Sequence, residues 1–230
     1  MEESPKVSIV ATSHHHHELP DTPYNLWTRD ELADLIDLPH DGTRVEIIGG
    51  EIVVSPGPDY AHNAIIRTIQ KQMFAAELAN PAYPWRCITT QDVVLSEIHD
   101  GYIPDLCFLS KKDDREARET QIKKLSPRHL ALAVEVTSPG NARNDRRPGP
   151  GRSGPTKWSG YARVGVPYYL LVERDPAAPM TTLFTCPDTF AGVYEESVRW
   201  RFGDEIRLPK PFGLVIPTDE WEPWQRGQSS

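Results

Sequence analysis

The sequence predicts one domain of mixed α/β class, with a central β-sheet flanked by helices. Apolar runs of β-type composition recur along the chain, and stretches with helical spacing separate them. The 230 residues are enough for one sizeable domain. The charged fraction of 25% and the hydrophobic fraction of 38% are those of an ordinary globular protein.

The chain begins with a polar stretch, followed by a helix and a hairpin. Residues 1–23 contain four adjacent histidines, and we expect a disordered tail there. Thr28 and Glu31 fit a capping box at the start of a helix that continues through ELADLIDL. RVEIIGGEIVVSP holds two short apolar runs about Gly49 and Gly50, which is typical of a hairpin.

The middle of the chain predicts the longest helix and most of the sheet. DYAHNAIIRTIQKQMFAAELAN keeps an apolar period near 3.6 residues, and Asp59 is a suitable N-cap. WRCITT, QDVVLS and YIPDLCFLS then have β-type composition. Residues 111–124 are highly charged and predict an exposed helix or loop, and residues 130–137, LALAVEVT, predict a buried strand.

The second half predicts a loop, a helix and a meander. SPGNARNDRRPGPGRSGPT is so rich in Pro and Gly that we expect no regular structure. KWSGYARVG predicts a short helix and PYYLLVE an apolar strand. MTTLFTC, AGVYEESVRWR and FGLVIP predict a β-meander that closes a domain spanning residues 24–218, with 219–230 as a C-terminal tail.

Charge and cysteine content restrict the partners. The net charge of −8 argues mildly against nucleic acid. Between residues 141 and 163, however, six basic residues face one acid, a local charge of +5 that suits a phosphate-facing loop or a solvated one equally. Three cysteines far apart favour a reducing cytoplasm, and no apolar run is long enough to span a membrane.

Two acids interrupt apolar β-type runs: Asp105 in YIPDLCFLS and Glu135 in LALAVEVT. A buried carboxylate is costly unless it is paired or binds a cation. If the two strands are neighbours, both acids could hold one Mg²⁺ or Mn²⁺ ion. Lys157, at the start of the following helix, could then orient water or neutralise developing charge. Alternatively, each acid is a strand-end carboxylate that binds a backbone N–H group or reaches solvent, and Lys157 is a surface lysine.

An ordered series of motifs resembles a known family. The series consists of VEIIGGEIVVSP, His62, YIPDL, LAVEVTSP, Asp145, Lys157, Tyr161 and GVPYYLLVE. It resembles the Uma-type family of restriction-endonuclease-like proteins over about residues 26–175. The resemblance implies a PD-(D/E)xK nuclease core and a metal-dependent endonuclease that hydrolyses DNA phosphodiester bonds with Mg²⁺ or Mn²⁺.

The resemblance also assigns site residues. Asp105 corresponds to the motif aspartate and Glu135 to the second acid, and with the backbone carbonyl of Val136 they would hold the metal. Thr137 stands where the superfamily usually has its lysine, and Lys157 resembles a lysine that has migrated into the next helix.

Two further residues match positions of the family. Glu46 matches the acid of the opening hairpin and would complete the catalytic site. His62 matches a recurrent histidine at the start of the long helix, where it would serve the site, or simply cap or pack.

One departure from the family pattern concerns spacing. Asp145 and Lys157 stand close together in the family but 12 residues apart here. Either the intervening loop bulges outward and Lys157 still docks, or Arg146 or Arg147 supplies the positive charge. We also expect Arg143, Arg146 and Arg147 to contact DNA phosphates.

The sequence leaves a second function open. Net acidity, the altered spacing and the absence of a recognisable DNA-reading module suit a non-catalytic module that retains the nuclease fold to bind nucleic acid or protein. Trp200, Trp221 and Trp224 could cover a homodimer face, although they suit core positions equally well.

Overall fold

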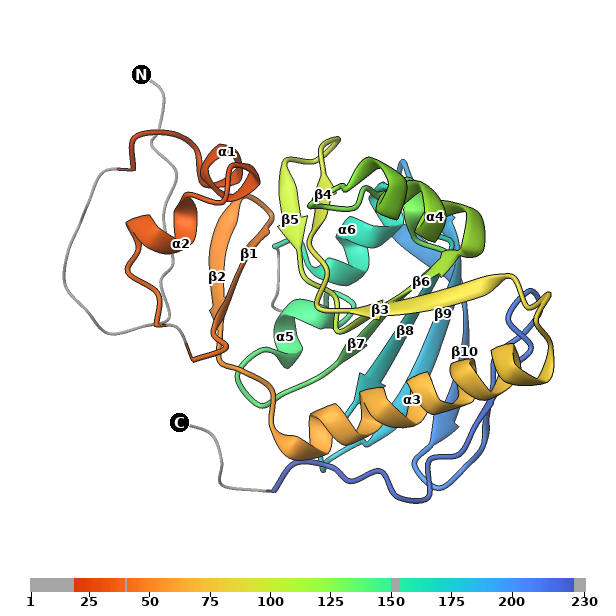
Figure 1. The fold of residues 1–230 in the computed structure, drawn as a ribbon. Helices are drawn as coiled ribbons and strands as arrows, with labels where there is room; N and C mark the ends of the chain where they lie inside the picture. The colour runs from red at the N-terminus through yellow and green to blue at the C-terminus, as the bar shows by residue number, and fades with distance from the viewer. Residues whose placement is uncertain (1–18, 40, 150–153, 226–230) are drawn as a thin grey trace.

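The computed structural model describes residues 19–39, 41–149 and 154–225, and these residues form a six-stranded, a four-stranded and a small two-stranded β-sheet with helices packed around them (Figure 1). The mixed α/β class with a large, helix-flanked mixed sheet is therefore confirmed. Most of the predicted N-terminal tail, including the four adjacent histidines, lies outside the described residues. None of the helices in the described part of the chain is both long and apolar enough to cross a membrane.

The large sheet has six strands, and only its central pair, β7 and β8, is parallel. In sheet order these are β10 (Val193–Arg201), β9 (Met180–Asp188), β8 (Tyr168–Glu173), β7 (Leu132–Val136), β6 (Leu106–Ser110) and β3 (Trp85–Thr89). The helix α6 (Lys157–Arg163) lies in the connection between β7 and β8, as expected for a parallel pair. Two segments of the predicted meander, MTTLFTC and AGVYEESVRWR, lie in β9 and β10, whereas FGLVIP contains β12 (Val215–Ile216), which pairs with β11 (Ile206–Arg207) in a separate two-stranded sheet.

The two faces of the large sheet pack against different helices. Leu132, Val134 and Val136 of β7 belong to an apolar core shared with α3 (Tyr60–Ala79), which crosses the sheet in Figure 1. Ala133 of the same strand belongs to a second core shared with α6. Because side chains alternate along a strand, Glu135 lies on the α6 face with Ala133.

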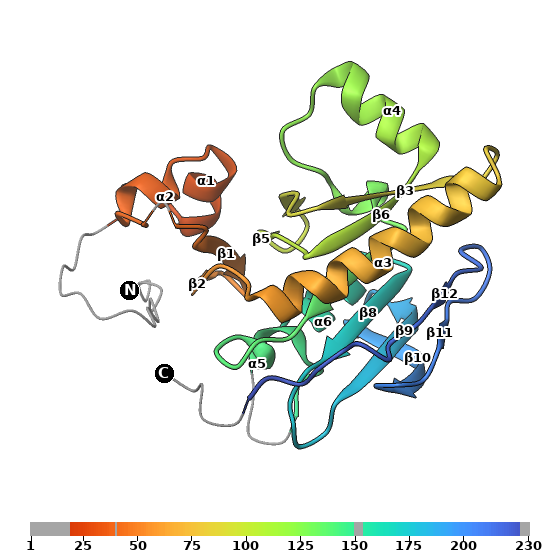
Figure 2. The same cartoon turned by 60° about the horizontal axis from the view of Figure 1, so that its bottom comes forward.

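The smaller sheet brings the N-terminal hairpin beside the α6 face. Its order is β2 (Glu51–Ser55), β1 (Arg44–Ile48), β5 (Asp100–Tyr102) and β4 (Val93–Leu95). The predicted turn is confirmed: Gly49 and Gly50 both have positive φ, and the Asp100 carboxylate accepts both of their N–H groups. On the outer side of this hairpin, Figures 1 and 2 show α1 (Pro23–Thr28) and α2 (Leu32–Leu35).

The remaining elements are short. They are α4 (Lys111–Thr120), the 3₁₀ helix η1 (Pro127–His129), α5 (Ala142–Asp145), β11 (Ile206–Arg207) and β12 (Val215–Ile216). The charged stretch after residue 110 is thus a helix. Asp59 caps α3 as predicted, its side chain accepting from the His62 N–H group.

Three local predictions are wrong. Thr28 ends α1 instead of capping a helix, because Thr22 is the N-cap and the chain reverses before α2. The predicted strand YIPDLCFLS is two strands, β5 and β6, and Asp105 lies just before β6. The Pro/Gly-rich loop contains one turn of helix, α5, which begins after its first proline and glycine.

The C-terminal tryptophans pack inside the domain. Trp221 is a buried core residue, although the sequence suggested a tail from residue 219. Trp200 is partly buried against the same core, and Trp224 is half-buried. Packing within the domain therefore explains the three tryptophans, and they no longer support the predicted homodimer face.

Candidate active site

Asp105 lies at the junction of the two sheets and of α3. The pairing of Leu106 with Val134 places Asp105 one step further along, opposite Glu135. Its Oδ2 atom accepts the Val136 N–H at 2.9 Å and lies 2.9 Å from Nε2 of His62. Arg44 of β1 donates to its Oδ1 atom at 3.0 Å.

These contacts keep Asp105 ionised despite its burial. Burial raises the pKa of the carboxyl group, but the hydrogen bond and charge of His62, the charge of Lys157 and the Val136 N–H together hold it at about 2. Asp105 is therefore a carboxylate at any physiological pH.

Lys157 is the centre of the site. Thr156 caps α6 through a reciprocal capping box with Ser159, which fixes Lys157 as the first residue of the helix. The side chain is buried, and its Nζ atom lies 2.8 Å from Glu46, 3.1 Å from Glu135 and 3.7 Å from Asp145. One ammonium group thus joins carboxylates from β1, β7 and α5.

The partners of Lys157 are held by hydrogen bonds of their own. Tyr161, one turn further along α6, donates its hydroxyl to Glu135 at 2.9 Å. The Ile103 N–H donates to Glu46 at 2.7 Å. Glu46 faces α6 because its neighbours Val45 and Ile47 point to the other side of β1, into the core beneath α1 and α2.

Burial and crowding raise the pKa of two acids beside Lys157, Glu135 and Asp145. Burial raises the pKa of Glu135 well above its usual value, with the Lys157 charge opposing and nearby carboxylates adding to the shift. Burial likewise raises the pKa of Asp145 to about 7. Burial lowers the pKa of Lys157, but the surrounding carboxylates outweigh it and raise that pKa, so the ammonium stays charged.

The charge balance and donor types fit a divalent cation. Four carboxylates, those of Glu46, Asp105, Glu135 and Asp145, contact two permanent cations, Lys157 and Arg44, which leaves two negative charges in excess when all are ionised. All four offer hard oxygen ligands of the kind that Mg²⁺ and Mn²⁺ prefer. An open cleft of about 920 Å³ is lined by Arg44, Glu46, Asp105, Asp145 and Lys157, together with Val136 and His62. Glu135 is not part of this lining and contacts it through Lys157.

The acids do not form a preformed metal site. No group of three or more His, Cys, Asp or Glu side chains in the described ranges is arranged to hold a metal. The reason is local: Lys157 lies among three of the carboxylates, and Arg44 and His62 contact the fourth. A cation would have to compete with Lys157 for Glu135.

The loop arginines have different surroundings. Arg146 is 2.5 Å from Glu173 and 3.1 Å from Asp175, so it does not replace Lys157 at the carboxylates. Arg147 lies over the Trp158 ring, 5.5 Å from its centroid. Arg143 lines the cleft. The insertion between Asp145 and Lys157 leaves Lys157 docked.

Sequence reasoning missed three members of the cluster. Arg44 stands two residues before Glu46, and this strand spacing could have placed both on one face. Tyr161 stands four residues after Lys157, and helical spacing gives the same signal. Asp145 was noted for its spacing from Lys157 and received no role.

Comparisons with known proteins agree with the fold. Residues 32–219 match the profile of the Uma2 family, described as "Putative restriction endonuclease". A crystal structure described as "a putative nuclease belonging to DUF820", from Anabaena variabilis, superposes with a TM-score of 0.54 and 14% sequence identity. The match covers 81% of this chain and 94% of that one, and it shows a shared fold. No curated protein gave a significant match.

Proposed function

Because the chain belongs to the Uma2 family, we propose that it is a metal-dependent endonuclease that hydrolyses DNA phosphodiester bonds. The observation that carries this proposal is that Asp105 and Lys157 line one open cleft, with Glu135 3.1 Å from the Nζ atom of Lys157. Two strand carboxylates beside a helix-borne lysine provide both ligands and a positive charge for a phosphate.

Asp105, Glu135 and the carbonyl of Val136 would hold Mg²⁺ or Mn²⁺. Such an ion, when bound, neutralises charge on a phosphate and lowers the pKa of a coordinated water. Asp105 suits this role because it is ionised at all relevant pH values. Glu135 becomes a ligand once its proton is lost, which the charge of Lys157 favours.

Lys157 cannot ligate a metal, since an ammonium group has only donors. Its place beside Glu135 would let it bind a phosphate oxygen or orient the attacking water. Glu46 positions Lys157, and Tyr161 positions Glu135. Arg143, on the cleft wall, together with Arg147 would contact backbone phosphates.

The test is a cleavage assay on plasmid and linear DNA with Mg²⁺ or Mn²⁺. Asp105→Asn removes a ligand's charge and keeps its shape, so cleavage should fall at least 100-fold, a loss of about 3 kcal/mol. Lys157→Ala should lose cleavage and still bind the metal. Asp219→Asn, an exposed aspartate outside the cleft, is the matched control and should cleave as wild type does.

A non-catalytic module is the second candidate. It is favoured by one observation: both oxygens of Asp105 already have protein partners, Arg44, His62 and Val136. If wild type and Asp105→Asn leave DNA equally intact across metals and substrates, and both bind it equally, this reading replaces the nuclease.

A further inference from the structure

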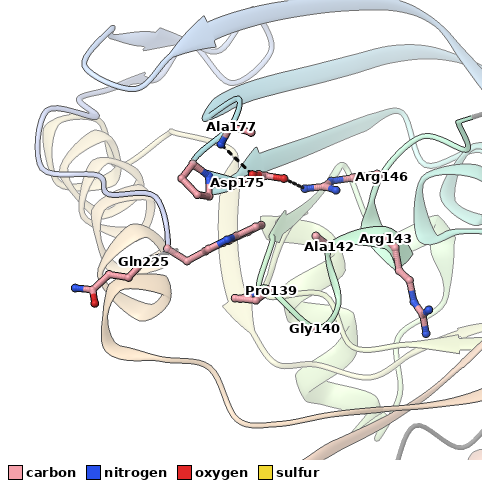
Figure 3. Close-up of a pocket in the computed structure, with 10 residues that line it drawn as sticks. Pro139, Gly140, Ala142, Arg143, Arg146, Asp175, Ala177 and Gln225 are labelled. Carbon is pink, nitrogen blue, oxygen red and sulfur yellow. Dashed lines mark hydrogen bonds and ion pairs between the residues drawn. The ribbon is translucent and has the colours of Figure 1, made fainter. Parts of the chain in front are cut away.

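A second pocket of about 510 Å³ opens beside the carboxylate cleft, where β7 and β8 end (Figure 3). It shares three wall residues with the cleft: Pro139, Gly140 and Arg143. The two cavities are therefore adjacent, on either side of the segment that follows β7. A polymer bound in the cleft would therefore place one of its neighbouring units in this pocket.

A fixed guanidinium forms one wall of the pocket. Arg146 is anchored by Glu173 and by Asp175, and Asp175 in turn accepts the Ala177 N–H at 2.9 Å (Figure 3). These bonds hold Arg146 in place before any ligand arrives, so little side-chain entropy is lost when it binds an anion or a base edge. Arg143 adds a second positive charge on the side shared with the cleft.

An aromatic residue, Trp224, also lines the pocket. Trp224 is half-buried, and its backbone N–H donates to the carbonyl of Arg174 at 3.0 Å. The buried side chain of Arg174 bonds the Glu222 carbonyl at 3.3 Å and the carboxylate of Asp59. The C-terminal segment is thereby attached to the start of α3 and to the end of β8. Trp224 lies beyond residue 219, where the family match ends.

Resting on the proposed function, we propose that this pocket holds one unpaired nucleobase of the strand being cut, next to the scissile phosphate. An indole ring beside guanidinium groups is the chemistry that binds a base, by stacking and by charge. A base inside a duplex has no free faces, because its neighbours in the stack cover them. The substrate class is therefore single-stranded DNA, or DNA with a frayed or extruded nucleotide at the cut.

The test is the binding of single-stranded oligonucleotides that carry one abasic position, moved stepwise along the strand. Fluorescence polarisation is measured with Mg²⁺ in an Asp105→Asn background, which prevents cutting. We expect one position at which loss of the base weakens binding about 10-fold. In Trp224→Ala that position should lose its effect, and Trp224→Phe should restore it.

A steric pair of variants provides an independent check. A Cβ atom added at Gly140 or at Gly149 meets nothing within 4 Å, so both positions have open space for the start of a side chain. Gly140 lines the pocket and Gly149 does not. Gly140→Phe should weaken single-strand binding about as much as Trp224→Ala does, and Gly149→Phe should not.

The outcomes separate the pocket from the nuclease. The pocket proposal is wrong if duplex and single-stranded DNA bind equally well and no abasic position shows an effect that depends on Trp224. If the wild type still cleaves DNA in that case, the nuclease proposal stands. A Trp224-dependent abasic position in a protein that never cleaves supports the pocket and refutes hydrolysis. If wild type binds no DNA and cleaves none, both proposals are wrong.

Discussion

The two faces of β7 have the same backbone and opposite chemistry. Leu132, Val134 and Val136 face α3 in an apolar core, while Glu135 faces α6 in a cluster of buried charges. The apolar face is stabilised by the close packing of side chains whose shapes and volumes fit together. The charged face is stable only while its acids and Lys157 remain together, because each buried charge depends on the others. The stability of the fold thus depends on apolar packing on the α3 side of the sheet and on the pairing of Lys157 with its acids on the α6 side.

The largest effect should come from Lys157→Met, which keeps the length of the side chain and removes its charge. Glu46, Glu135 and Asp145 would remain buried without their shared cation, so the free energy of unfolding should fall by about 4 kcal/mol at pH 8. The loss should shrink at pH 5, where the acids can take up protons. Denaturant unfolding at both pH values measures this, with exposed Lys112→Met as the control. A loss independent of pH would contradict the electrostatic explanation.

On the apolar face, Ile69→Ala should cost about 3 kcal/mol, because Ile69 is fully buried between α3 and the sheet. The loss should be the same at pH 5 and pH 8. Phe74→Ala, half-exposed on the same helix, should cost less than 1 kcal/mol. A pH-dependent loss at Ile69 would show that the two faces are coupled.

Asp145→Asn should flatten the dependence of stability on pH. Burial raises the pKa of Asp145 from 3.8 to about 7, so the folded state binds the proton more tightly than the unfolded state. Asp145 therefore does not lower the free energy of unfolding of the wild type below about pH 4. As the pH rises from 4 towards 7, the buried carboxyl group loses its proton and the free energy of unfolding falls. At about 1.4 kcal/mol per pKa unit the upper bound is about 4 kcal/mol, and we expect about 2 because buried sites relax. An unchanged slope between pH 4 and 7 would place the titration elsewhere.

The smallest effect should come from Tyr161→Phe, which removes the hydroxyl that donates to Glu135 and keeps the ring contact with Tyr102. Stability should fall by about 1 kcal/mol, and affinity for Mn²⁺ should change as Glu135 loses its orientation. Tyr194→Phe removes a hydroxyl that donates to the Val166 carbonyl on the same face of the sheet. That control should cost similar stability and leave Mn²⁺ affinity unaltered, and equal Mn²⁺ affinities in both variants would remove Tyr161 from the site.

The sequence predicted the elements that depend on local pattern. Period and capping identify α3, and Gly49 and Gly50 identify the hairpin, because helical spacing and turn geometry are properties of neighbouring residues. The capping box at Thr28 was wrong because Thr22 caps a separate short helix, α1, that ends at Thr28, and α2 begins only at Leu32. A local signal cannot decide between two such caps.

The site was predictable only in part, because its contacts are long-range. Alternation in β7 marks Glu135 as a buried acid, and the resemblance joins it to Asp105 and Lys157. The ion pair of Arg44 with Asp105 spans 61 positions, and it depends on how two separate sheets meet. The same is true of Arg146, whose partners are Glu173, the last residue of β8, and Asp175, which follows that strand.

The most direct test of the account is anomalous diffraction from a crystal grown with Mn²⁺. The account predicts one manganese peak within bonding distance of the carboxylates of Asp105 and Glu135 and of the Val136 carbonyl, with Lys157 nearby and not bound to the ion. The peak should vanish in Asp105→Asn and persist in Lys157→Ala. A wild-type crystal with no peak at these carboxylates at millimolar Mn²⁺, or with one only at other residues, would contradict the metal site and the nuclease mechanism that depends on it.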